Sequence, residues 1–139
     1  MSLLCLIGED SPPVTHHLKS YAEMCGFEVV HVTEGESVLD VARRMQLVLI
    51  LLNAELPGRL RGWEVLRLLK ADDVTCRIPV VTYCVGDEDG LRHQAEGADA
   101  WFRMPVLYGG FRRILAKAGV KPPGIAARRC SDDIPSRDG

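Results

Sequence analysis

The sequence has no hydrophobic run long enough to cross a membrane and no recognisable export signal. Its longest apolar run, Leu47–Leu52, has six residues, whereas a membrane-spanning helix needs about 20. The first apolar residues are not preceded by a basic region, which a typical signal peptide requires. We therefore expect a cytoplasmic protein that has no membrane partner.

Cysteine pairs with the spacing of a zinc site are also missing. The chain has five cysteines, an odd number, and none of them forms a Cys-x-x-Cys motif. This pattern argues against both a disulfide framework and a structural zinc site. It is typical of a protein that stays in a reducing cytoplasm. The five cysteines are Cys5, Cys25, Cys76, Cys84 and Cys130.

An excess of charge of either sign is absent as well. Seventeen basic side chains face nineteen acidic ones, so the formal net charge is -2. A nucleic-acid-binding protein usually carries a strong positive field, which this composition does not supply. We expect no nucleic-acid partner. The length of 139 residues and a hydrophobic content of 47% fit one globular domain.

Strand-like and helix-like segments alternate along the chain. The predicted strands are Leu3–Ile7, Phe27–Val32, Leu47–Leu52, Ile78–Cys84 and Ala98–Phe102. Leu47–Leu52 is apolar at every position, as in a central parallel strand that helices cover on both faces. Strict alternation of strands and helices predicts right-handed crossovers and a parallel sheet between two helical layers.

The intervening segments show helical periodicity. Pro12 and Pro13 suit the first turn of a helix that Gly26 ends. Thr33 and Glu36 have the spacing of a capping box for a second helix. The buried stripe of that helix is predicted to be Val38, Val41, Ala42 and Met45. Further helices are predicted over Trp63–Ala71, over Leu91–Glu96, and around Phe111, Ile114, Leu115 and Ala118.

The periodic pattern stops after residue 118. The remaining residues, 119–139, are polar and aperiodic, which is typical of a flexible tail. We therefore predict one domain over residues 1–118 and a C-terminal tail over residues 119–139.

Polar residues follow several of the predicted strands. Glu9 and Asp10 follow the first strand, Asn53 follows the third, and Arg103 to Pro105 follow the fifth; Cys84 ends the fourth. In an open parallel sheet these carboxyl ends lie at one edge, where the functional crevice forms. We expect these residues to meet in space.

Residues 3–118 resemble a response-regulator receiver domain of two-component signalling. The motifs that carry the resemblance are Glu9-Asp10, the strand that leads to Asn53 with Pro57-Gly58, Gly62-Trp-Glu-Val-Leu, Ile78-Pro79-Val80, and Gly97 to Pro105. The resemblance implies an α/β fold with a doubly wound five-stranded parallel sheet. It implies the flavodoxin-like, CheY-like (βα)5 arrangement with strand order 2-1-3-4-5.

The same resemblance implies transfer of a phosphoryl group from a histidine kinase to an aspartate, assisted by a divalent metal, a hydroxyl residue and a lysine. Here the position of the aspartate holds Asn53, whose amide cannot act as a carboxylate nucleophile. The lysine position holds Met104. The Ser/Thr position holds Cys84, or Thr82 if the shortening lies inside the strand; Cys84 is preferred because a loop shortens more easily than a central strand.

Other positions of the family pattern are kept. Glu9 and Asp10 supply an acidic pocket, to which Glu55 can add charge. We expect no cofactor, although two carboxylates could still bind Mg²⁺ weakly. Acids at a helix N-terminus also stabilise the helix without any further role. Pro105 falls on the cis-proline position, and Trp101 falls on the aromatic switch position. Packing is the plainer interpretation of the tryptophan.

Three functions follow from these residues. The favoured one is an atypical receiver, not an enzyme, that acts independently of phosphorylation by binding a histidine kinase or an output protein. The face around the fourth and fifth strands and helices is the predicted contact surface, and a homodimer is a further option.

The alternatives are a metal-dependent phosphoacceptor that uses a substitute carboxylate, and a small-ligand or redox-sensing module in which the altered crevice binds a neutral molecule or Cys84 reacts as a thiol. Asn53 is either a deliberate lock or a relic, and Met104 with Cys84 is interpreted as a better-packed pocket.

Overall fold

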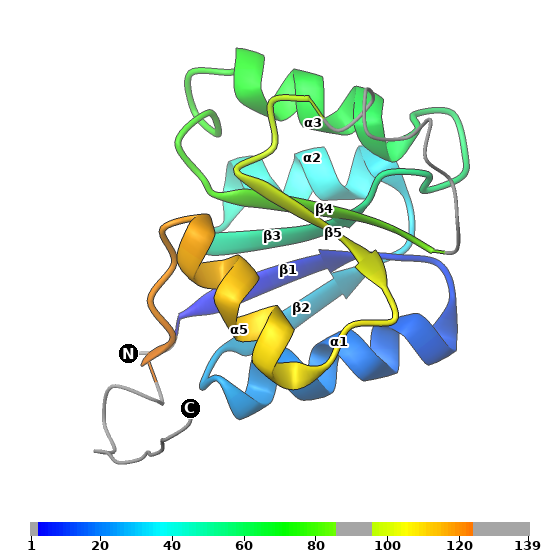
Figure 1. The fold of residues 1–139 in the computed structure, drawn as a ribbon. Coiled ribbons are helices and arrows are strands. Elements are labelled where there is room, and N and C mark those ends of the chain that lie inside the picture. The colour runs from blue at the N-terminus through cyan, green and yellow to red at the C-terminus, as the bar shows by residue number, and fades with distance from the viewer. Residues whose placement is uncertain (1–2, 86–95, 124–139) are drawn as a thin grey trace.

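The computed structural model describes residues 3–85 and 96–123. Within these ranges strands and helices alternate around one central sheet (Figure 1). The strands are β1 (Leu4–Gly8), β2 (Glu28–Val32), β3 (Leu47–Asn53), β4 (Val80–Val85) and β5 (Ala100–Met104). The helices are α1 (Pro12–Met24), α2 (Gly35–Arg44), α3 (Gly62–Ala71) and α5 (Tyr108–Lys117).

The sheet has five parallel strands in the order β2-β1-β3-β4-β5. This order confirms the predicted doubly wound arrangement. The order reverses at β1, which lies between β2 and β3, so the crevice between β1 and β3 opens at their carboxyl ends. In the β3–β4 register Asn53 lies opposite Tyr83.

Two apolar layers hold the helices against the sheet. Helices α1 and α5 cover one face, and α2 and α3 cover the other (Figure 1). Alternate residues of β3 serve the two layers: Leu49 and Leu51 face α1 and α5, while Ile50 and Leu52 face α2 and α3. All four side chains are fully buried. The apolar run therefore forms a central strand, as predicted.

The start of α2 differs from the prediction. Helix α2 begins at Gly35 with Glu34 as its N-cap residue, and no side chain caps it. The predicted capping box of Thr33 and Glu36 is therefore wrong, because the helix begins one residue too late for Thr33 to occupy the N-cap position. Met45 is also wrongly placed in the buried stripe. It caps the C-terminus in an extended conformation and is 38% exposed.

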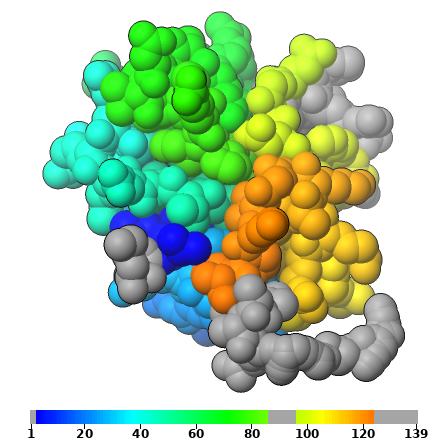
Figure 2. Space-filling model, turned by 90° about the vertical axis from the view of Figure 1, so that its left-hand side faces the viewer, coloured from blue at the N-terminus to red at the C-terminus, as the bar shows by residue number. Residues whose placement is uncertain are grey.

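Residues beyond α5 continue the core. Val120 is buried and packs in the layer that α1 and α5 cover, with Leu3 at its edge. Figure 2 shows this edge of the molecule, where the chain after α5 (orange) passes close to the start of β1 (blue). The helix predicted over Leu91–Glu96 lies outside the described residues except for Glu96, which is in a turn.

Two further features of the described residues concern the lengths of the helices and the state of the cysteines. Within residues 3–85 and 96–123, every helix is too short or too polar to span a bilayer. Four cysteines belong to these ranges and all four are free thiols.

Candidate functional site

The carboxyl edge of the sheet brings together three side chains from three neighbouring strands. Glu9 directly follows β1, Asn53 ends β3, and Tyr83 lies opposite Asn53 on β4. All three are buried: Glu9 is 1% exposed, Asn53 8% and Tyr83 1%. We name them the Glu9–Asn53–Tyr83 cluster. Glu9 and Asn53 were predicted site residues, and Tyr83 was not.

The Glu9 carboxylate is the centre of this cluster. Its Oε1 atom accepts a hydrogen bond from the Asn53 amide (Nδ2 to Oε1, 3.0 Å) and one from the Tyr83 hydroxyl (2.5 Å). Its Oε2 atom accepts the backbone N–H groups of Asp10 (3.1 Å) and Ser11 (2.9 Å). In the described part of the chain Glu9 forms no ion pair. These four hydrogen bonds compensate for its burial.

The Asn53 side chain is held at both ends. Its Oδ1 atom accepts the backbone N–H of Glu55 at 2.8 Å, while its Nδ2 group donates to Glu9. This arrangement fixes which end of the amide faces Glu9, because a carboxylate offers only acceptors and the Glu55 N–H is a donor. Asn53 is thus matched to both neighbours as an amide. An aspartate here would retain the Glu55 contact and lose the Glu9 contact.

Tyr83 reaches the carboxylate from inside the core. Its ring stacks on Phe102 of β5, with centroids 5.3 Å apart and an interplanar angle of 23°. Burial, followed by the nearby charge of Glu9, raises the pKa of the Tyr83 hydroxyl well above its usual range. The hydroxyl therefore keeps its proton and acts as a donor. A distance of 2.5 Å is typical of an O–H group that donates to a carboxylate.

The loop from β1 to α1 is tied to β2 beside the cluster. The backbone N–H of Glu9 donates to the Val32 carbonyl at 3.1 Å, and the His31 Nε2–H donates to the Glu9 carbonyl at 2.8 Å. Thr15 of α1 is close to the same ring nitrogen, at 3.3 Å. These contacts hold the backbone of Glu9 in place and so orient its side chain toward Asn53 and Tyr83.

The other predicted acids do not join Glu9. Asp10 and Glu55 are both exposed. Within residues 3–85 and 96–123, no three His, Cys, Asp or Glu side chains lie close enough together to hold a metal ion. The structure therefore separates the acid pair into one buried, hydrogen-bonded carboxylate and one solvent-exposed carboxylate.

Cys84 and Thr82 lie on β4 on either side of Tyr83, so they face the opposite side of the strand. Both are buried, at 2% and 0% exposure. Neither forms a hydrogen bond with Glu9 or Asn53, and the Thr82 hydroxyl has no partner in the part of the chain that the structure describes.

Met104 ends β5 and is buried in the layer under α1 and α5. The peptide bond between Met104 and Pro105 is cis. Met104 is a neutral apolar side chain at the carboxyl edge of the sheet, so it brings no positive charge toward Glu9. It packs with Phe102 and Phe111 in the same apolar cluster.

The edge formed by β5 and α5 carries exposed apolar groups. Trp101 of β5 is 37% exposed, Val85 at the end of β4 is 50% exposed, and Leu107 before α5 is 82% exposed. Arg112 and Arg113 of α5 are exposed as well. Apolar groups beside charged ones on one edge are typical of surfaces that bind other proteins.

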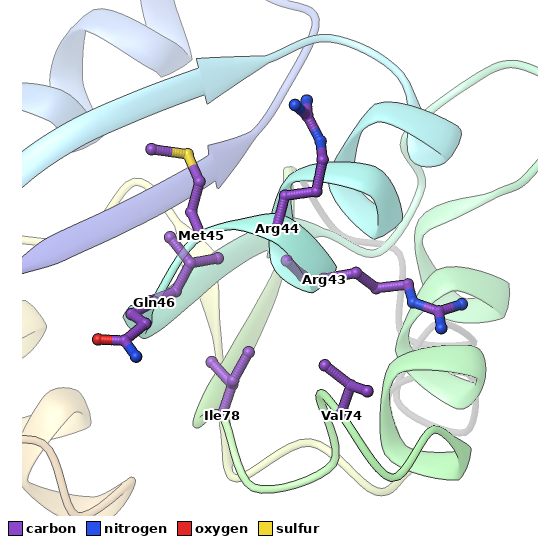
Figure 3. Close-up of a pocket in the computed structure, with 8 residues that line it drawn as sticks. Arg43, Arg44, Met45, Gln46, Val74 and Ile78 are labelled. Carbon is purple, nitrogen blue, oxygen red and sulfur yellow. The ribbon is translucent and has the colours of Figure 1, made fainter.

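An open pocket of about 470 Å³ lies at the opposite edge of the sheet, where β3 and β4 begin. In Figure 3, Ile78 and Val74 rise from one side of it, while Arg43 extends toward α3. Arg43 pairs with Asp72 at 3.5 Å, and Arg44 pairs with Asp40 at 2.8 Å. Both arginines next to this pocket already have acidic partners, and the pocket is remote from the Glu9–Asn53–Tyr83 cluster.

Known proteins share both the sequence pattern and the fold. A family model described as "Response regulator receiver domain" matches residues 5–104. The polar-differentiation response regulator DivK of Brucella anthropi is 31% identical over 105 residues, which cover 73% of this chain and 83% of DivK. DivK of Brucella ovis is 30% identical over 110 residues, which cover 76% of this chain and 87% of that protein.

Solved structures agree with this match. The receiver domain of the sensor histidine kinase PA1611 from Pseudomonas aeruginosa, with a magnesium ion in its active-site cleft, has a TM-score of 0.76 at 21% identity. The match covers 86% of this chain and 99% of that one. The chemotaxis protein CheY4 of Vibrio cholerae has a TM-score of 0.74 at 16% identity over 85% of this chain and 99% of that one. The sequence matches and the CheY-like fold together establish that the chain belongs to the response-regulator receiver domain family of two-component signalling.

Proposed function

We propose that this receiver domain does not use an aspartyl phosphate and acts by binding another signalling protein. In this proposal Asn53 stands at the phosphoacceptor position and Met104 at the position of the family's lysine. Membership of the receiver family follows from the matches to the family model and to DivK.

One observation supports the proposal most strongly: the Asn53 amide donates a hydrogen bond to the buried Glu9 carboxylate. The nitrogen lone pair of an amide is delocalised and its oxygen carries no full charge, so Asn53 is not a nucleophile for phosphorus. The amide also suits its surroundings better than an acid would, because it pairs with Glu9 at one end and with the Glu55 N–H at the other. A relic without a role would not need to fit both partners, so this fit favours a lock.

A divalent cation fits the described residues poorly. Mg²⁺ prefers several oxygen ligands in octahedral geometry and keeps much of its water. Glu9 is buried and already accepts four hydrogen bonds, Asp10 and Glu55 are exposed, and no three metal-ligating side chains gather among the described residues. Met104 supplies no charge for a bound phosphoryl group. The described side chains therefore do not form the oxygen-rich ligand set of a magnesium site.

The edge formed by β5 and α5 is the proposed partner surface. Trp101 of β5 and Leu107 before α5 supply exposed apolar area, and Arg112 and Arg113 of α5 supply exposed positive charge. Tryptophan and arginine are the residue types most enriched at the centres of protein interfaces. The partner in this proposal is a histidine kinase or an output protein of the pathway.

The two alternatives have weaker support. A substitute phosphoacceptor would have to be Glu9, Asp10 or Glu55. Glu9 is buried and out of reach of a phosphoryl donor. Asp10 and Glu55 are exposed, and neither forms an ion pair with a cation among the described residues. A redox role would need a reachable thiolate, whereas Cys84 is only 2% exposed.

Incubation of the full chain with acetyl phosphate and magnesium tests the proposal. Intact-protein mass spectrometry should show no phosphorylated species, because no described carboxylate stands at a nucleophilic position. A receiver domain that has the usual aspartate, run in parallel, shows that the reagent is active. A phosphorylated species that hydroxylamine removes would refute the proposal, and peptide mapping to Asp10 or Glu55 would then support the substitute-carboxylate alternative.

A further inference from the structure

We infer that Tyr83 is the residue that closes this site to divalent cations: its hydroxyl occupies the position on Glu9 that a metal ion would need. This inference deepens the proposed function, because it names a second feature besides Asn53 that keeps the domain independent of metal and phosphate. From the sequence alone, Tyr83 is recognisable only as a residue of a buried strand.

The hydrogen-bond count of Glu9 carries the inference. An ionised carboxylate has about four lone-pair positions on its two oxygens. Two donors use Oε1, namely the Asn53 amide and the Tyr83 hydroxyl, and two backbone N–H groups use Oε2. All four positions are therefore occupied by protein donors. A cation that binds Glu9 must first displace one of them.

Two of the four donors are side chains, Asn53 and Tyr83, and Tyr83 is the one outside the phosphoacceptor position. The two backbone donors follow from the turn between β1 and α1, which any residue at position 9 would experience. The Tyr83 hydroxyl comes instead from the adjacent core, where the ring stacks on Phe102. A phenylalanine would keep this stacking and remove the donor.

The Tyr83 hydroxyl also helps to join three strands at this edge of the sheet. Glu9 follows β1, Asn53 ends β3, and Tyr83 belongs to β4. A metal ion in such a crevice draws loops of several strands together through shared oxygen ligands. Here the hydroxyl and the amide converge on the same oxygen and link three strands by hydrogen bonds that use the same carboxylate.

Four proteins test the inference: the natural sequence, Asn53→Asp, Tyr83→Phe, and the double variant Asn53→Asp/Tyr83→Phe. Magnesium chloride is titrated into each while amide NMR shifts around residue 53 are followed. The double variant should bind Mg²⁺ about tenfold or more tightly than Asn53→Asp, because a charge-assisted hydrogen bond no longer competes for Glu9. The natural protein should show no saturable response.

Tyr21→Phe, combined with Asn53→Asp, is the matched control. Tyr21 also donates its hydroxyl to one acceptor, the Val106 carbonyl at 2.9 Å, but outside the cluster. This variant should bind Mg²⁺ like Asn53→Asp alone. Equal affinities of Asn53→Asp and the double variant would overturn the inference and leave the role of Asn53 in place. Phosphorylation of the natural protein would instead overturn the proposed function, so the two failures are distinguishable.

The natural protein supplies a second readout that does not require the double variant to fold. The Tyr83 hydroxyl proton is buried and donated to a carboxylate, so it should exchange slowly with water and give its own NMR signal. Magnesium should leave this signal unchanged. Loss of the signal during the magnesium titration would show that a cation reaches Glu9 in spite of Tyr83, and it would contradict the inference.

Discussion

Gly62→Ala is expected to destabilise the domain by about 3 kcal/mol or more. A Cβ atom at residue 62 would lie 1.8 Å from the carbonyl oxygen of Asn53 and 2.9 Å from the carbonyl carbon of Ala54. Both are backbone atoms and cannot rotate away. The first turn of α3 would have to move off the end of β3, with loss of the hydrogen bond from the Trp63 N–H to the Ala54 carbonyl.

Urea denaturation followed by circular dichroism measures this loss. Gly109→Ala in α5 is the matched control, since the nearest atom to its new Cβ would be the flexible Arg113 side chain at 3.8 Å. Alanine is favoured over glycine in helices, so this control should be neutral or more stable by about 0.5–1 kcal/mol. A Gly62→Ala protein as stable as the natural one would show that α3 does not pack so closely on Asn53.

Asn53→Asp is expected to lower the free energy of unfolding at neutral pH by about 3 kcal/mol. The substitution replaces the donor that faces Glu9 with a second carboxylate oxygen, about 3 Å from the first in a buried setting. Like charges at this distance repel strongly when little water separates them.

Asn53→Leu separates this repulsion from the loss of the amide. Leucine has nearly the same shape and no charge, so it removes the hydrogen bonds to Glu9 and from the Glu55 N–H without adding repulsion. It should cost about 1–2 kcal/mol, less than Asn53→Asp. If chemical denaturation shows Asn53→Asp to be as stable as the natural protein, the amide is not required by its neighbours and the lock interpretation fails.

The parts of the structure that were predictable from the sequence are those fixed by short-range patterns. The run Leu47–Leu52 is apolar at every position and forms the central strand, and Gly26 ends α1 in a left-handed conformation with a φ of 98°. Asn53 was identifiable because it directly follows a buried strand. Its position on the chain, and nothing about its contacts, marked it as a site residue.

Tyr83 was not predictable in the same way. In the segment Val80–Val85 a tyrosine among β-branched residues is typical of a buried strand, where aromatic residues are common. Its role depends on the register that sets it opposite Asn53 and on the approach of Glu9 from β1. Such long-range contacts leave no local periodicity. The partial signal was its hydroxyl, since a buried tyrosine usually finds a partner.

The capping error at α2 has a different cause. Thr33 and Glu36 fit a local spacing rule, but the helix begins at Gly35, which packs tightly against Leu60 and Val65. A Cβ at residue 35 would lie 2.7 Å from the Leu60 carbonyl oxygen and from a methyl group of Val65. Contact between α2 and the segment before α3 therefore constrains where the helix begins. Tertiary packing, and not the local capping pattern, therefore sets the first residue of α2.

Magnesium and beryllofluoride, a mimic of the phosphoryl group, test the central claim most directly. Both are titrated into the natural protein, with Asn53→Asp as the comparison, while the amide shifts at Asn53 and the indole signal of Trp101 are recorded by NMR. The natural protein is predicted to show no saturable shift at either residue. Asn53 offers no carboxylate, Tyr83 already occupies Glu9, and Met104 offers no positive charge to the mimic. A saturable shift at Asn53 together with a change at Trp101 would contradict the account and identify a receiver that still senses phosphate.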